Sequence, residues 1–103
     1  MSIKTVNDIS FKSEVLDQDL VLVDFSAEWC KPCVVQHEIL SKFANQNPDI
    51  KIVEVNVDDS PEVAKEFKIK AMPTLLVFKN SEVVAKKVGL TSGLDLEKLI
   101  TSA

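Results

Sequence analysis

Two cysteines, Cys30 and Cys33, are the only thiols in this chain of 103 residues, and two residues separate them. They lie between an apolar run at 20–25 and a segment of helical spacing that begins at Cys33. Backbone N–H groups at the start of a helix carry a partial positive charge, which favours a thiolate over a thiol at Cys30. A thiolate attacks disulfides, and Cys33 can then displace the reduced substrate from Cys30. The pattern therefore predicts thiol–disulfide exchange.

Three other interpretations of the cysteine pair remain open. A structural disulfide across two residues closes a small loop and contributes only about 2 kcal/mol. A zinc site needs two more ligands, whereas the chain has one histidine and no second pair of cysteines, so the metal would have to be shared between two copies. Two inert core thiols are the third interpretation. We favour redox chemistry over all three and expect no metal.

Asp24 is the one carboxylate in the apolar run at 20–25. Such a run is typical of a strand that is buried on both faces. Burial raises the pKa of a carboxyl group, which brings Asp24 nearer to the range useful to a general base. A hydrogen-bonded structural residue and an edge position are the alternative interpretations of Asp24.

The hydrophobic pattern predicts helices and strands that would position these groups. Helical spacing occurs at 7–17, at 33–47 and after Ser92, a short helix follows a cap at Ser60, and strand-like runs occur at 20–25, 50–57, 74–79 and 82–88. Pro32 suits the first turn of the helix at 33–47, and we place Gln36 on a polar face of that helix. Residues 20–57 predict parallel strands joined by a right-handed crossover, and the connection at 80–81 predicts an antiparallel hairpin.

Charge and composition exclude several classes of protein. The net charge is −4 and all 12 basic residues are lysine, so we do not expect nucleic-acid binding. With only two glycines, neither a phosphate-binding loop nor a dinucleotide fingerprint can be present. The longest apolar runs have four residues, against roughly 20 for a membrane span. Residues 1–5 lack the pattern of a secretory signal, so we expect a cytoplasmic protein with one domain at 1–103.

Three motifs carry a family resemblance. Val-Asp-Phe-Ser-Ala-Glu-Trp-Cys-Lys-Pro-Cys at 23–33, Met-Pro-Thr-Leu at 72–75 and Lys-Val-Gly at 87–89 resemble thioredoxins, and the order of elements agrees from about residue 3 to residue 102. The resemblance implies a thioredoxin fold, in which four helices flank a central mixed five-stranded sheet. It also implies a monomer that binds no cofactor and reduces disulfides in client proteins. An NADPH-dependent flavoprotein reductase would recycle it and would hold both the NADPH and the flavin.

The resemblance also implies roles for individual residues. It makes Cys30 the nucleophile and Cys33 the resolving thiol, and it makes Asp24 a buried proton relay for Cys33. Pro73 would follow a cis peptide bond opposite the dithiol, although most X–Pro bonds are trans. The backbone of Met72 would pair with an extended client segment. Trp29, Met72 and Gly89 would form a docking surface around Cys30, with ordinary packing as the alternative for Trp29 and Met72.

Two positions, one inside the first motif and one after it, depart from the family pattern. Lys31 stands where thioredoxins usually have glycine, between the cysteines and next to Pro32. A cation near the thiolate should make the disulfide more oxidising by roughly 10 to 20 mV, unless Lys31 only points into solvent. Glu38 replaces a proline that commonly kinks the helix, so we expect a straighter helix.

Glu54 and His37 form a second departure. Glu54 occupies a position where many members have a lysine near the buried aspartate. If Glu54 and Asp24 share a pocket, repulsion and desolvation should raise at least one pKa. His37, the only histidine, lies one helical turn after Cys33. We hypothesise that His37 lies near Cys33 and both carboxylates, with a solvated bystander as the alternative.

Two classes of function compete for this sequence. The first is a disulfide reductase that works through the cysteine pair. The second is a binding module that uses the groove of the fold without catalysis, or a paralogue specialised for one partner. Retention of both cysteines, Trp29, Asp24 and Pro73 favours the reductase.

Overall fold

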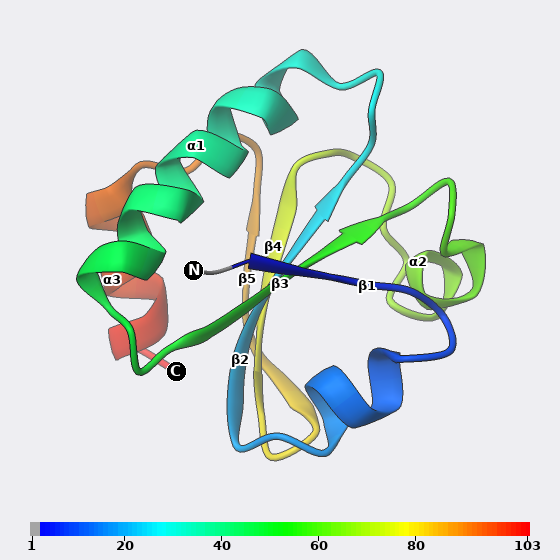
Figure 1. Ribbon diagram of the computed structural model, residues 1–103, viewed down its shortest axis with the longest axis horizontal. Coiled ribbons are helices and arrows are strands. Elements are labelled where there is room, and N and C mark those ends of the chain that lie inside the picture. Colours follow the sequence, from blue (N-terminus) through cyan, green and yellow to red (C-terminus); the bar gives the residue numbers. More distant parts are fainter. Residues whose placement is uncertain (1–2) are drawn as a thin grey trace.

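The computed structural model describes residues 3–103 and shows a central sheet with helices on both faces (Figure 1). The strands are β1 (Ile3–Val6), β2 (Leu20–Ser26), β3 (Lys51–Asn56), β4 (Thr74–Lys79) and β5 (Glu82–Val88). The helical segments are a π-helical turn, η1 (Lys12–Leu16), and the helices α1 (Lys31–Gln46), α2 (Pro61–Glu66) and α3 (Gly93–Thr101). Residues 1 and 2, which belong to the segment 1–5 where no secretory signal is predicted, lie outside the described residues.

The five strands are arranged in the order β1-β3-β2-β4-β5. Both β1 and β2 pair with β3 in parallel, whereas β4 is antiparallel to both β2 and β5. The parallel β2–α1–β3 unit and the β4–β5 hairpin are therefore confirmed. The mixed five-stranded sheet with four helical segments is the architecture that the resemblance implied.

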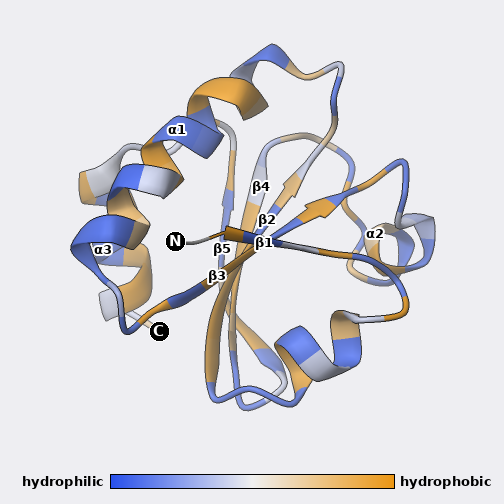
Figure 2. Ribbon diagram, viewed as in Figure 1, coloured by the Kyte–Doolittle hydropathy of each residue, from blue (hydrophilic) through white to orange (hydrophobic). Residues whose placement is uncertain are grey.

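An apolar core lies on each face of the sheet. On one face, Leu40 and Phe43 of α1 and Leu96 of α3 pack against Leu22 of β2 and Ile52 of β3. Figure 2 shows hydrophobic residues along the central strands and an alternation of hydrophobic and hydrophilic residues along α1. Because side chains two residues apart on a strand share a face, Asp24 and Glu54 also point toward the α1 side of the sheet. The opposite face is covered by η1 and α2.

The core on the η1 and α2 side includes a cluster of three aromatic rings. Phe11, Phe67 and Phe78 have ring centroids 5.1 to 5.7 Å apart. Val15 of η1 and Val63 of α2 belong to the same core. None of the helices formed by residues 3–103 is both long enough and apolar enough to cross a membrane.

The N-terminal segment differs from the prediction in part. The predicted helix over 7–17 is confirmed in its second half, where η1 forms, and Asn7 Oδ1 accepts hydrogen bonds from the amides of Ile9 and Ser10, both at 2.9 Å, in the turn before it. Hydrogen bonds of this kind are typical of the first turn of a helix. Ile9, which would lie on the apolar face of that helix, is 92% exposed. The pattern also gives no prediction of β1, a four-residue strand with only one buried residue, Val6.

Asp8, rather than Ser60, caps α2 with its side chain. Asp8 Oδ1 accepts from the amide of Val63 at 2.9 Å, and Oδ2 accepts from the amide of Glu62 at 3.3 Å. Ser60 occupies the N-cap position as predicted, but its side chain makes no capping hydrogen bond. Ser92 caps α3, since its hydroxyl accepts from the amide of Asp95 at 3.2 Å. The N-terminal segment is thereby tied to α2 across more than 50 residues of sequence.

Candidate active site

Cys30 and Cys33 lie at the N-terminus of α1, directly after the loop that leaves β2. Cys30 is the N-cap residue with extended backbone angles, φ −95° and ψ 106°. The two cysteines form a disulfide with Cα atoms 5.3 Å apart, and the amide of Cys33 donates to Cys30 Sγ at 3.2 Å. Pro32 occupies the first turn of α1, as predicted. A reduced Cys30 at this position would meet the partial positive charge of the helix, which favours a thiolate.

Met72, Pro73 and Gly89 come together beside the dithiol. Met72 packs against the small cluster formed by Ala27 and the two cysteines. The Met72–Pro73 peptide bond is cis, as the resemblance implied. The amide of Gly89 donates to the carbonyl oxygen of Pro73 at 2.8 Å. Gly89 has φ +95°, a left-handed conformation that a residue with a Cβ adopts only with strain.

Trp29 and Lys31 flank Cys30 on the surface. The indole of Trp29 is 68% exposed, and its Nε1 donates to Asp58 Oδ2 at 2.9 Å. This hydrogen bond fixes the ring, so Trp29 is ordered without being packed in the core. Lys31 is exposed, in the first turn of α1.

Asp24 lies at the centre of the sheet, opposite Glu54 on β3 and Leu75 on β4. Its side chain is fully buried. Among residues 3–103, neither carboxyl oxygen of Asp24 has a hydrogen-bond partner. Burial, and to a lesser degree the negative charge of Glu54, raises the pKa of Asp24 to about 8. The direction of this pKa shift is the predicted one, and pairing of β2 on both sides excludes the edge position for Asp24.

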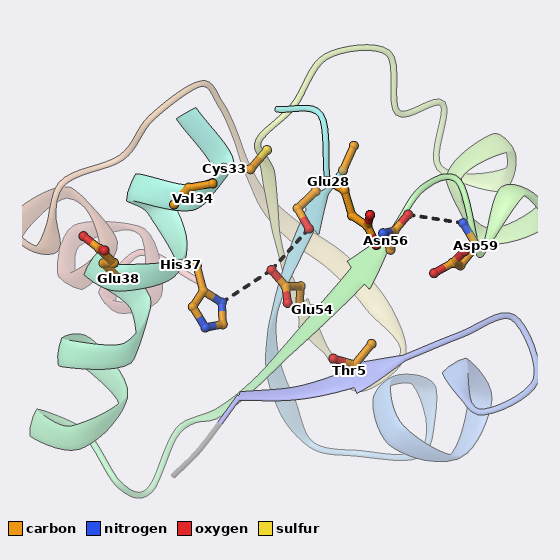
Figure 3. Close-up of a pocket in the computed structure, with 11 residues that line it drawn as sticks. Thr5, Glu28, Cys33, Val34, His37, Glu38, Glu54, Asn56 and Asp59 are labelled. Atoms are coloured by element: carbon orange, nitrogen blue, oxygen red, sulfur yellow. Dashed lines mark hydrogen bonds and ion pairs between the residues drawn. The ribbon is translucent and has the colours of Figure 1, made fainter. Parts of the chain in front are cut away.

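Glu54 and His37 meet at a cavity that also reaches Cys33. His37 Nδ1 lies 3.5 Å from Glu54 Oε2, and the two side chains point toward one another (Figure 3). Ser26 Oγ donates to the same carboxylate oxygen at 3.2 Å. The cavity has a volume of about 520 Å³, and its lining also includes three acidic residues, Glu28, Glu38 and Asp59. The structure therefore brings His37 to Glu54 and to the cavity beside Cys33, whereas Asp24 is not among the residues that line this cavity.

The prediction that Gln36 lies on a polar face of the helix is wrong. Its side chain is fully buried and makes two hydrogen bonds with the backbone of Thr91. The spacing of Gln36 could have indicated its burial. It lies three residues after Cys33 and four before Leu40, and both of these residues belong to the buried face of α1. Sequence reasoning also missed Ser26 and Asp58, whose partners are distant in sequence.

A dithiol at a helix N-terminus, beside a cis-proline and above a buried carboxyl in a mixed sheet, defines a class of dithiol–disulfide oxidoreductases. The family model named Thioredoxin matches residues 2–102 of the chain. The chain is 41% identical over 102 residues to "Thioredoxin" of Porphyra purpurea, covering 97% of this chain and 95% of that protein. It is 45% identical over 86 residues to "Thioredoxin 1" of Nostoc sp., covering 82% and 80% of the two chains.

A solved structure agrees with these relatives. It belongs to work on the "Structural basis of the thiol resolving mechanism in yeast mitochondrial 1-Cys peroxiredoxin via glutathione/thioredoxin systems". One of its chains superimposes with a TM-score of 0.88 at 33% identity, covering 99% of this chain and 96% of that one. The chain belongs to the thioredoxin family and is a protein-disulfide oxidoreductase.

Proposed function

We propose that the chain reduces disulfides in client proteins by two successive exchanges at Cys30 and Cys33. The Cys30 thiolate attacks one sulfur of a client disulfide, and the other client sulfur leaves as a thiolate. Cys33 then loses its proton and attacks Cys30 Sγ, which releases the second client sulfur as a thiolate. Two electrons pass to the client, and the Cys30–Cys33 disulfide remains on the protein.

The observation that supports this order of attack is the hydrogen bond from the Cys33 amide to Cys30 Sγ. A donor at this distance stabilises negative charge on the outer sulfur, so Cys30 is the better thiolate of the two. Lys31 adds a positive charge on the solvent side, and Pro32 holds the first turn without presenting an amide of its own. Both residues therefore tune the outer cysteine.

Asp24, in the fraction of molecules in which it is ionised, is the group proposed to take the proton from Cys33. Its pKa of about 8 is close to the ordinary pKa of a cysteine thiol, about 8.5. Proton transfer between groups of matched pKa has little free-energy cost in either direction. The charge of Glu54 contributes to the raised pKa of Asp24, and a protonated His37 would offset that charge through its contact with Glu54. Glu54 and His37 are thus proposed to adjust the pKa of Asp24, and with it the step in which Cys33 loses its proton and attacks.

The client is proposed to dock on the surface formed by Trp29, Met72, Pro73 and Gly89. An exposed indole and a cis-proline preceded by Met72, which packs against the two cysteines, suit an extended peptide segment. Membership in the family implies protein clients and a reductase that restores the dithiol. We further propose that this reductase is an NADPH-dependent flavoprotein, and that the chain is a cytoplasmic monomer whose residues 1–103 form one domain and bind no cofactor.

Reduction of insulin by dithiothreitol tests the proposal. The native protein should accelerate the appearance of turbidity, because it transfers electrons from dithiothreitol to insulin disulfides. The Cys30→Ser variant should not accelerate it. Equal rates for the two proteins would remove the reductase function, and the binding module would then be the better interpretation.

A further inference from the structure

Gln36 is a buried polar side chain with no part in the exchange reaction described above. It is fully buried, as is Thr91. Gln36 Nε2 donates to the carbonyl oxygen of Thr91 at 3.0 Å, and Gln36 Oε1 accepts from the amide of Thr91 at 2.7 Å. One side-chain amide therefore satisfies both backbone groups of a residue 55 positions away.

Thr91 belongs to the loop at 89–92 that joins β5 to α3 and passes beside α1 (Figure 1). Its hydroxyl donates to the carbonyl oxygen of Gly89 at 3.0 Å. The amide of Gly89 in turn donates to the carbonyl oxygen of Pro73 at 2.8 Å. Hydrogen bonds thus connect α1, which carries Cys33 one turn before Gln36, with the loop and with the cis-proline.

The same contacts set the direction of the side chains on the loop. Thr91 is held inward, while Leu90 in the loop and Val88 at the end of β5 are 51% and 53% exposed. One exposed apolar side chain therefore precedes Gly89 and one follows it. Without the contacts of Gln36, the hydrogen bonds at Pro73 and at Ser92 would hold the two ends of the loop, but Thr91 between them would lose its attachment to α1.

We propose that Gln36 is a positioning residue for client recognition, because it fixes the loop at 89–92 relative to α1 and the dithiol. This inference rests on the proposed function. Gln36 hydrogen-bonds to the loop backbone and not to either cysteine sulfur, so it acts on the docking surface rather than on thiol chemistry. An apolar side chain at position 36 would leave the amide and carbonyl of Thr91 without these partners. Because buried backbone groups without hydrogen bonds are unfavourable, the loop would then shift to a position in which they are satisfied.

The test compares Gln36→Leu with the native protein and with Gln46→Leu, a matched change at the exposed end of α1. Insulin reduction by dithiothreitol at varied insulin concentration gives kcat and KM. Reaction of the reduced protein with 5,5′-dithiobis(2-nitrobenzoate) gives the reactivity of the thiols toward a small disulfide. Hydrogen exchange at the Thr91 amide reports whether the loop is still anchored.

Gln36→Leu should raise the KM for insulin about fivefold or more, with a smaller change in kcat. Its reaction with the small disulfide should stay within about twofold of the native rate. Its Thr91 amide should exchange faster, and Gln46→Leu should match the native protein throughout. A native KM together with fast exchange at Thr91 would overturn the inference, and so would equal slowing with both disulfides.

A second variant covers the case in which Gln36→Leu does not fold. Thr91→Val keeps the size of the side chain and removes only the hydroxyl that donates to Gly89. It should raise the KM for insulin by a smaller factor, and an unchanged KM would count against the inference. If the native protein itself fails to reduce insulin, the proposed function fails, whereas a native KM in the variants refutes only the positioning role.

Discussion

Replacing Asp24 by alanine should stabilise the oxidised protein at pH 7 and remove most of the pH dependence of its stability between pH 4 and pH 8. The carboxyl group of Asp24 is fully buried, and among residues 3–103 it has no hydrogen-bond partner. Its pKa is raised from 3.8 to about 8, first by burial and second by the charge of Glu54. The folded protein therefore keeps a proton that the unfolded chain releases near pH 4.

The magnitude follows from this difference in proton binding. Within the window from about pH 4 to about pH 8 the folded state binds more protons, so the free energy of unfolding falls as pH rises, by up to about 1.4 kcal/mol per pH unit. At pH 7 the accumulated loss is roughly 4 kcal/mol. Removal of the carboxyl group leaves a small cavity that costs about 1 kcal/mol. Asp24→Ala should thus gain about 3 kcal/mol at pH 7 and nothing near pH 4.

Urea unfolding of both oxidised proteins at pH 4.5, 6 and 7.5 measures this difference. The two free energies should diverge as pH rises, because only the native protein contains the buried acid. Asp49→Ala, which removes an exposed carboxylate, is the matched control and should follow the native protein. Parallel curves for native protein and Asp24→Ala would refute the raised pKa of Asp24.

Three further substitutions test other contacts. Asp8→Ala should lower the free energy of unfolding by about 1 kcal/mol, because two amides of α2 lose their acceptor, and a native urea midpoint would contradict the cap. His37→Ala should shift the pH profile of Cys33 alkylation, measured with Cys30 replaced by serine, because His37 contacts Glu54; an unchanged profile would make His37 a bystander. Lys31→Gln should lower the reduction potential by about 10 to 20 mV against glutathione, and an equal or higher potential would show that Lys31 does not favour the thiolate.

The elements that the sequence predicts well are those whose pattern has one physical explanation. The run at 20–25 is apolar on both faces because β2 lies at the centre of the sheet between β3 and β4. The hairpin at 74–88 follows from two strand-like runs and a two-residue connection. The segment at 3–6 gives no such signal, since β1 is an edge strand with one buried residue.

The parts of the site that lie far apart in sequence can be predicted only in part. Burial of Asp24 follows from its apolar neighbours, and its raised pKa follows from burial. The cis bond before Pro73 follows only from family resemblance, because nothing local in the sequence favours it. The proximity of His37 to Glu54 is a hypothesis from helical spacing, and the 3.5 Å contact between their side chains supports it. The effect of His37 on Cys33 stays a prediction.

Gln36 shows why polarity alone misassigns a face. A polar residue on an amphipathic helix is usually exposed, and the sequence around Gln36 does not reveal that the backbone of Thr91 lies beside it in the core. The partner is 55 residues away and is a backbone group, so no residue type marks it. Asp8 at the start of α2 is a similar case, since its partners are also backbone amides.

Trapping of the mixed disulfide tests most directly whether Cys30 attacks the client and Cys33 resolves the adduct. Reduced Cys33→Ser should form a covalent adduct with insulin through Cys30 that persists until dithiothreitol is added, because the resolving thiol is missing. Mass spectrometry of the digested adduct should place the bond at Cys30, and Cys30→Ser should form no comparable adduct. Equal trapping by both variants, or an adduct only with Cys30→Ser, would contradict attack by Cys30 and resolution by Cys33.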